Sequence, residues 1–233
     1  MQTELLVEAV ENNIRQLRAT FKTQINDFFF TEKELHSYFY HLCISNRIFQ
    51  HENYSLIHAE YPSPFKCSFL EQSPYVRQEP MNANKMRAHV DCVIVNPAFI
   101  TWLTAHKGPY GMKPLIGLGN ALFQTYIEEF YETYRSFNEE ISQPILLYAL
   151  EFKFLRQSYS GIKYPRLNIQ QDLAKLRLLR HFTTDGLPVD FVGRTRSLIF
   201  IGDRVKNPFQ TGIGNLFKGY SSDEYEVITR NEP

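Results

Sequence analysis

The chain has 233 residues, with 25 lysine and arginine residues balanced by 25 aspartate and glutamate residues. This length suits one domain with a full hydrophobic core, and the zero formal net charge argues against a uniformly basic, histone-like coat protein. The three cysteines, Cys43, Cys67 and Cys92, form no Cys-x-x-Cys pair, which argues against a disulfide framework and a zinc site. We expect them to be small buried side chains in a reducing compartment.

The N-terminal segment argues against export and membrane insertion. Glu4 and Glu8 stand where a signal peptide would carry basic residues. The longest apolar run, 145–150, is far shorter than the roughly 20 residues that cross a bilayer. We therefore expect a soluble, cytoplasmic protein without a membrane partner.

Two helices are predicted at the start of the chain. Residues 4–28 carry an apolar stripe at helical spacing, made of Val7, Val10, Ile14, Leu17, Phe21 and Phe28. The stripe either packs on the domain itself or forms a homodimer, because its spacing is close to a heptad. Thr31 followed by Glu34 is a capping-box pattern, which predicts a second helix over 32–45.

Two strands and a loop follow. A strand is predicted over 54–61, ended by Pro62 and Pro64, and the segment 74–85 has the composition of a loop. A second strand is predicted over 88–95. Side chains alternate across a strand, so its even-numbered residues face one way, while His89 and Asp91 face the other with two valines.

The second half of the chain alternates between helices and strands. Helices are predicted over 98–105 and 120–140, with a glycine- and proline-rich loop over 108–119. The strand predicted over 145–155 is apolar nearly throughout, as expected of a central strand buried on both faces.

The last predicted elements are one helix and one strand. Asn168 is predicted to cap a helix over 169–182, and residues 197–201 read as a short apolar strand. Beyond Gly202 the sequence assigns no element. Together the elements predict a single mixed α/β domain over 1–233, divided into an N-terminal helix (1–30), a core (31–201) and a C-terminal extension (202–233).

Three charged residues interrupt the apolar strands. Glu151 and Lys153 are two residues apart and point to the same face, and Asp91 interrupts the earlier strand. A buried charge costs several kcal/mol unless it is paired or bound to a metal. Glu151 and Lys153 either neutralise each other at the end of the strand or belong to a site. Two carboxylates from neighbouring strands suit Mg²⁺, which takes one or two carboxylates plus waters and phosphate oxygens.

These residues resemble the PD-(D/E)XK nuclease superfamily. The matching parts are Asp91, the tripeptide Glu151-Phe152-Lys153 and the helix start 169–176. The resemblance implies a restriction-endonuclease-like fold, in which a mixed central sheet is flanked by helices. Val90 stands where the family's motif has proline, and the long stretch from Asp91 to Glu151 implies a helical insertion between the core strands.

The resemblance also implies roles for single residues. Asp91 and Glu151 would bind Mg²⁺, for which Mn²⁺ can substitute, and Lys153 would assist the attacking water. Gln171, or its neighbour Gln170, stands where the family often has a supporting glutamine.

Four further residues are candidates for the same site. Glu60 is a candidate extra metal ligand. Glu34 competes with it, because the resemblance implies a glutamate on the first helix of the core, although its capping-box position also explains it. His89 shares the strand face of Asp91, and Lys175 shares a helix face with Gln171.

The segment 153–180 is locally basic, with Asp172 as its one acidic residue. Such a stretch beside two carboxylates would suit a phosphate backbone, or it is a solvated face offset by acidic neighbours. The basic residues are Lys153, Arg156, Lys163, Arg166, Lys175, Arg177 and Arg180.

The sequence therefore predicts a metal-dependent nuclease that hydrolyses phosphodiester bonds of nucleic acid, with DNA as the expected substrate. The alternative is a catalytically inactive module of the same fold that binds nucleic acid or a protein partner. In either case the N-terminal helix is a candidate homodimer interface.

Overall fold

The computed structural model describes residues 2–23, 31–69, 76–79, 85, 87–107, 120–155, 163–202 and 217–229, with the backbone alone at 69, 107, 120–125 and 163–167. The predicted loop 108–119 lies outside these residues. Among the described helices, none combines the length and the apolar character that crossing a bilayer requires.

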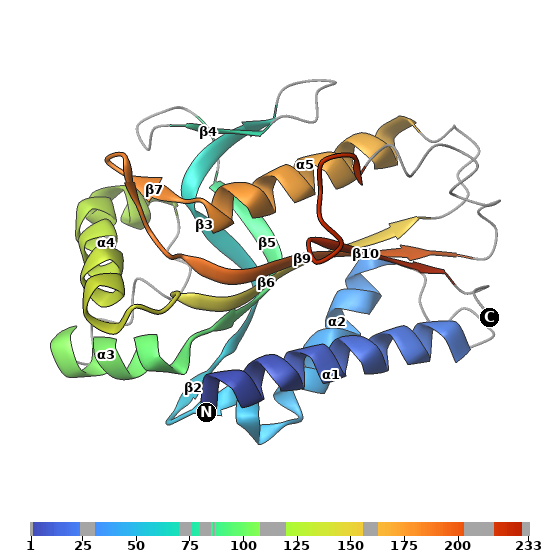
Figure 1. Ribbon diagram of the computed structural model, residues 1–233, viewed down its shortest axis with the longest axis horizontal. Helices are drawn as coiled ribbons and strands as arrows, with labels where there is room; N and C mark the ends of the chain where they lie inside the picture. Colours follow the sequence, from blue (N-terminus) through green and yellow to red (C-terminus); the bar gives the residue numbers. More distant parts are fainter. Residues whose placement is uncertain are drawn as a thin grey trace.

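A six-stranded mixed sheet forms the centre of the molecule (Figure 1). Its order is β10-β9-β6-β5-β3-β4. The pairs β3–β4, β3–β5 and β5–β6 are antiparallel, whereas β6–β9 and β9–β10 are parallel. The strands are β3 (Ile57–Phe69), β4 (Val76–Glu79), β5 (Arg87–Val95), β6 (Leu146–Leu155), β9 (Val192–Ile201) and β10 (Tyr225–Thr229). The predicted α/β class and mixed central sheet are confirmed.

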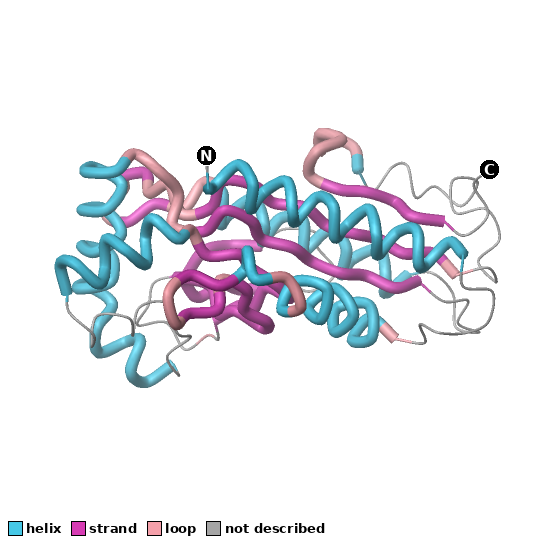
Figure 2. Tube along the Cα trace, turned by 90° about the horizontal axis from the view of Figure 1, so that it is seen from below, coloured by secondary structure: helices cyan, strands magenta, loops and turns pink. Residues whose placement is uncertain are grey.

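Helices lie on both faces of this sheet (Figures 1 and 2). One face carries α1 (Gln2–Thr23) and α2 (Glu32–Ile44), and the other carries α5 (Lys163–Arg180). At one end lie α3 (Pro97–Lys107) and α4 (Asn120–Ile141), which form the predicted helical insertion between β5 and β6.

Short elements complete the described chain. A 3-10 helix, η1 (Arg47–Phe49), leads into the two-stranded pair β1 (Gln50–His51) and β2 (Tyr54–Ser55). A second two-stranded pair, β7 (Thr183–Thr184) and β8 (Leu187–Pro188), follows α5.

The central strand β6 joins the site to the core. Its first seven residues are buried, as its apolar sequence predicts. Phe152 packs against the rings of His36 and Phe39 on α2, and Phe154 packs edge to face against Phe21 of α1. Because alternate residues of a strand face opposite ways, Glu151 and Lys153 leave β6 toward the other face.

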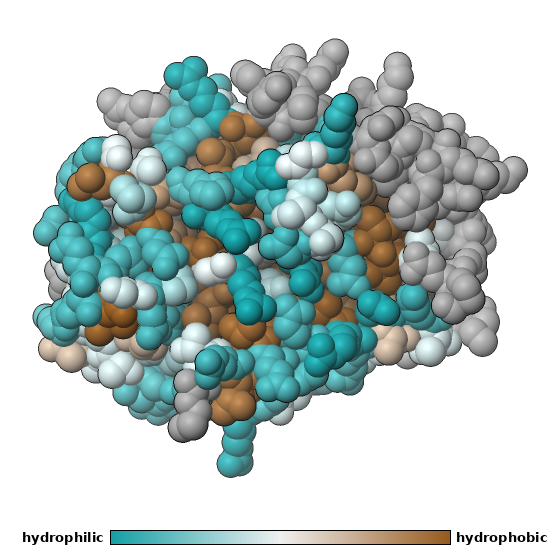
Figure 3. Space-filling view, viewed as in Figure 1, coloured by the Kyte–Doolittle hydropathy of each residue, from teal (hydrophilic) through white to brown (hydrophobic). Residues whose placement is uncertain are grey.

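The apolar stripe of α1 packs on its own domain. Its buried residues are Leu6, Val10, Asn13, Ile14, Leu17 and Phe21. Val7 is only partly buried, and Phe28 lies outside the described residues. A homodimer through this helix stays a prediction, and it would have to use another part of the helix, such as the exposed Leu5. Figure 3 shows mainly hydrophilic residues on the described surface of one face, with hydrophobic residues in the gaps between them.

The capping box at the start of α2 is confirmed. The Thr31 amide donates to Glu34 Oε2 at 2.6 Å, and the Glu34 amide donates to Thr31 Oγ1 at 3.3 Å. The three cysteines are buried and free, also as predicted.

The predicted end of the first strand is wrong. β3 continues through Pro62 and Pro64 to Phe69, and its pairing with β5 shifts register between Pro62 and Lys66. Proline lacks an amide donor, so it is tolerated where the ladder is already irregular. The buried Arg87 side chain donates to the carbonyls of Ser63 at 2.7 Å and Pro62 at 3.2 Å, which satisfies part of this stretch.

Other boundaries also differ from the predictions. The predicted loop 74–85 contains β4, and the extension beyond Gly202 contains β10. Asn168 is not a cap, because α5 begins at Lys163. Pro165 is compatible with that early start, since the first turn of a helix leaves its amides without helical partners. β9 begins at Val192 rather than Ser197. The prediction missed the first half of this strand because that half is mostly polar and lacks the apolar run of the second half.

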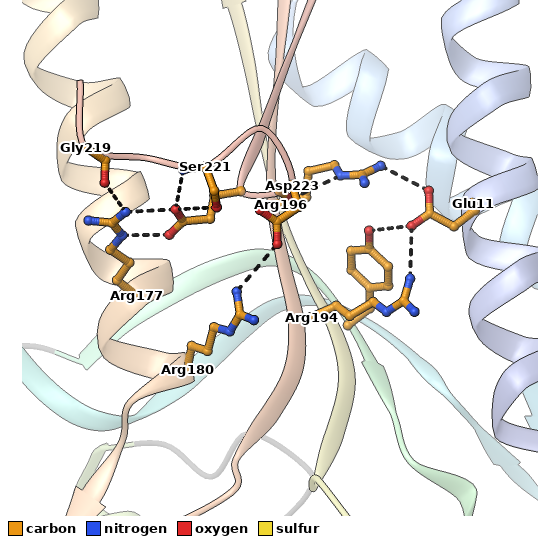
Figure 4. Close-up of polar contacts among 10 residues, drawn as sticks. Glu11, Arg177, Arg180, Arg194, Arg196, Gly219, Ser221 and Asp223 are labelled. Carbon is orange, nitrogen blue, oxygen red and sulfur yellow. Dashed lines mark hydrogen bonds and ion pairs between the residues drawn. The ribbon is translucent and has the colours of Figure 1, made fainter. Parts of the chain in front are cut away.

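An arginine of α5 connects that helix to the segment before β10 (Figure 4). Arg177 donates to both carboxylate oxygens of Glu224, at 2.6 and 2.8 Å, and Ser221 donates to the same carboxylate through its amide and hydroxyl. The Arg177 guanidinium also lies over the Tyr220 ring, 3.9 Å from its centre. The hydrogen bonds from Arg177, with those from Ser221, hold the pKa of Glu224 at about 2.

We expect acid to weaken the fold through Glu224. A carboxyl with a lowered pKa stabilises the fold above its ordinary value of 4.5, and this contribution is lost as the pH falls toward about 2. Urea denaturation of the wild type and Glu224→Gln across this window tests the effect. The stability difference between the two should shrink as the pH falls. An unchanged difference would contradict this role for Glu224.

Candidate functional site

Adjacent strands bring Asp91 and Glu151 together. In the antiparallel pairing of β5 and β6, Cys92 lies opposite Leu150, and the next residues along the two strands are Asp91 and Glu151. The backbone pairing ends at this point, and the Phe152 amide instead donates to Asp91 Oδ2 at 2.7 Å. One oxygen of Asp91 thus replaces a backbone acceptor. Within the described part of the chain, the other oxygen makes no hydrogen bond or ion pair.

Glu151 is buried beside Lys175, which the sequence analysis gave only as a further candidate for the site. Its residue is 1% exposed, and Lys175 Nζ lies 2.5 Å from Glu151 Oε1. Burial raises the pKa of Glu151 well above its ordinary value, and the charge of Lys175 opposes this effect. The pairing supplies the compensation that a buried carboxylate needs.

Lys153 is held by two other carboxylates. Its Nζ lies 2.9 Å from Glu32 Oε1 on α2 and 3.0 Å from Asp172 Oδ2 on α5. Burial disfavours the charged form of Lys153, but Asp172 and Glu32 outweigh burial and raise the pKa of this ammonium above its usual range. Its side chain stays 19% exposed, against 6% for Lys175.

Asp172 connects the two lysines. Its Oδ1 lies 3.2 Å from Lys175 Nζ, while its Oδ2 contacts Lys153. We call the six residues the charged cluster; they are Glu32, Asp91, Glu151, Asp172, Lys153 and Lys175. With all six ionised, four carboxylates face two ammonium groups, which leaves an excess of two negative charges.

Two members of the charged cluster were missed in the sequence. Glu32 is the glutamate of α2 that reaches Lys153, whereas Glu34, the residue chosen for that role, caps the helix. Burial raises the pKa of Glu32 despite the nearby Lys153. In the sequence, Asp172 is the one acidic residue of the basic segment 153–180 and was not predicted as a site residue. Its position three residues before Lys175, on one helix face, was the available signal.

The other predicted site residues lie as follows. The His89 side chain is exposed, and His89 contributes its backbone carbonyl, which accepts from Lys175 Nζ at 2.7 Å. Glu60 is exposed and adopts a left-handed backbone conformation, with φ of 49°. Gln170 and Gln171 are half-buried on α5, immediately before Asp172.

The predicted basic wall is largely neutralised where the structure describes it. Lys153 and Lys175 belong to the charged cluster, Arg177 pairs with Glu224, and Arg180 lies 3.9 Å from Asp223. Figure 4 shows Arg177 and Arg180 pointing toward the segment before β10. The side chains of Arg156, Lys163 and Arg166 lie outside the described residues.

The charged cluster contains carboxylates, which are the ligand type that a magnesium site with few protein ligands would use. Among the described residues, no set of three or more His, Cys, Asp and Glu side chains is arranged to hold a metal. Two carboxylates, Asp91 and Glu151, lie on adjacent strands, and Mg²⁺ binds through one or two carboxylates while keeping several waters. The excess of two negative charges also fits a divalent cation.

Comparison of the chain with protein-family models, with curated proteins and with solved structures gives no match.

Proposed function

We propose that the protein is a metal-dependent nuclease that hydrolyses phosphodiester bonds of nucleic acid, with DNA as the expected substrate. The observation that carries the proposal is the charged cluster around the buried Glu151, in which acids outnumber lysines by two. A buried carboxylate with excess negative charge nearby is costly unless a cation completes the site or a carboxyl takes up a proton, and a divalent cation can supply the missing charge.

Asp91 and Glu151 would hold Mg²⁺, or Mn²⁺ in its place. When bound, such an ion polarises a phosphoryl group and lowers the pKa of a coordinated water. One carboxylate oxygen of Asp91 has no hydrogen-bond or ion-pair partner among the described residues, and the other accepts a hydrogen bond from the Phe152 amide. Glu151 is fixed by its burial in β6.

Lys153 is the lysine that would meet the substrate. Lys153 is more exposed than Lys175, and its ammonium is held by Glu32 of α2 and Asp172 of α5. In that position it can stabilise charge on a phosphate oxygen or orient a water. Gln171, with Gln170 as its alternative, would support the site from α5.

Cleavage of supercoiled plasmid and of single-stranded DNA, with Mg²⁺ or Mn²⁺, tests this function. We expect metal-dependent nicking, and we expect Lys153→Ala to slow it by about a hundredfold or more, as for the loss of a group that stabilises charge in the transition state. Lys33→Ala is the matched control, because Lys33 is exposed on α2 beside Glu32. Equal loss in both variants would contradict the role of Lys153.

The alternative is a non-catalytic module that binds nucleic acid or a protein. The contact between Lys175 and Glu151 favours it, because an internal cation already compensates the buried carboxylate. No cleavage of either DNA, together with no rise in melting temperature on adding Mg²⁺ or Mn²⁺, would favour this alternative.

A further inference from the structure

The ammonium of Lys175 lies among three protein oxygens. They are Glu151 Oε1 at 2.5 Å, the His89 carbonyl at 2.7 Å and Asp172 Oδ1 at 3.2 Å. Lys175 is 5% exposed, so water has little access to it. Lys175 Nζ donates hydrogen bonds to the His89 carbonyl and to Asp172 Oδ1, and its contact with Glu151 Oε1 is an ion pair, so the three oxygens come from β5, α5 and β6.

These oxygens are of the kinds that bind hard cations. Carboxylates and backbone carbonyls are the usual protein ligands of Ca²⁺, and carboxylates are those of Mg²⁺. The ammonium of Lys175 thus has the surroundings of a bound cation. Because Glu151 is also a ligand in the proposed metal site, the lysine and a metal ion would share one carboxylate.

We propose that Lys175 is a tethered counter-ion that holds Glu151 when no metal is bound and that a divalent cation must displace from it. The inference rests on the proposed function, since it concerns the same carboxylate. It makes Lys175 a positioning residue that sets the metal concentration at which the site fills.

The geometry allows this exchange without leaving the Lys175 ammonium unpaired. Lys175 also contacts Asp172 and the His89 carbonyl, so it can leave Glu151 and keep two partners. Its four-carbon side chain gives the ammonium room to move. Lys153 differs, because its contacts are with Glu32 and Asp172 rather than with Glu151.

Thermal unfolding of the full chain across a Mn²⁺ titration tests the proposal. We expect Lys175→Met to lower the Mn²⁺ concentration that gives half of the stabilisation by about tenfold or more, because the competing cation is gone. Lys153→Met is the matched control, since it removes one positive charge from the same charged cluster but leaves Glu151 paired. It should shift the midpoint much less.

The outcomes separate the inference from the proposed function. If Mn²⁺ stabilises the wild type and Lys175→Met has the same midpoint, or both lysine variants shift it equally, the inference fails and the metal site stands. If Mn²⁺ stabilises none of the three proteins, the metal-dependent function fails as well. If Lys175→Met folds only with Mn²⁺, the inference is supported. The double variant Glu151→Gln/Lys175→Met should fold and show little response to Mn²⁺; a strong response would overturn the inference.

Discussion

Without metal, Lys175→Met is expected to lower the free energy of unfolding by about 3–5 kcal/mol at neutral pH, the usual effect of removing one partner of a buried ion pair. Glu151 would stay buried without its nearest cation, while Asp172 and Asp91 add negative charge to its surroundings. Urea denaturation with a metal chelator present measures the change.

The double variant Glu151→Gln/Lys175→Met is the control for this prediction. Replacing both charges removes the unpaired group, so most of the lost stability should return. Lys33→Met, at an exposed position on α2, should stay within about 0.5 kcal/mol of the wild type. A double variant as unstable as Lys175→Met would show that the side-chain packing, rather than the ion pair, carries the effect.

Asp91→Asn is expected to reduce metal-dependent DNA cleavage by about 10²–10³-fold, because a metal's contribution to the transition state is worth several kcal/mol. The asparagine oxygen can still accept from the Phe152 amide, so the strand geometry should survive. Rates of plasmid nicking, measured beside urea denaturation, separate the loss of chemistry from a loss of fold.

Asp185→Asn is the matched control for Asp91→Asn. Asp185 has a left-handed backbone conformation, which asparagine also tolerates, and its ion pair with Arg135 is exposed. We expect wild-type cleavage from this variant. Wild-type cleavage from Asp91→Asn would instead remove Asp91 from the site and contradict the proposed function.

The central strands were the most predictable part of the fold. The apolar run of β6 and the alternation in β5 gave their positions to within one residue, and thereby the strand positions of Asp91 and Glu151. The capping box located the start of α2, because it is a pattern of residues close together in the sequence, like the patterns of β5 and β6. β10 was missed although Tyr, Val, Ile and Thr favour strands, because it is only 5 residues long and pairs at the edge of the sheet with β9.

The partners of the charged residues were the least predictable part. Glu32, Asp172 and Lys175 meet Glu151 and Lys153 only when α2 and α5 are placed beside β6. Sequence spacing relates residues within one helix or strand, whereas these contacts join three elements. The continuation of β3 through Pro62 and Pro64 was unpredictable for the same reason: Arg87, which donates to this stretch, comes from another strand.

The packing of α1 has a consequence for folding during synthesis. Phe21 lies against Phe154 and Phe200, Arg18 pairs with Glu226, and Arg196 donates to Glu11. Helix α1 is therefore synthesised well before the strands that complete the burial of Phe21, although α2 covers part of its apolar stripe earlier. Contacts so distant in sequence slow folding and leave apolar surface exposed to aggregation meanwhile. Nascent chains that stop before β9 should therefore depend on chaperones more than the finished protein does.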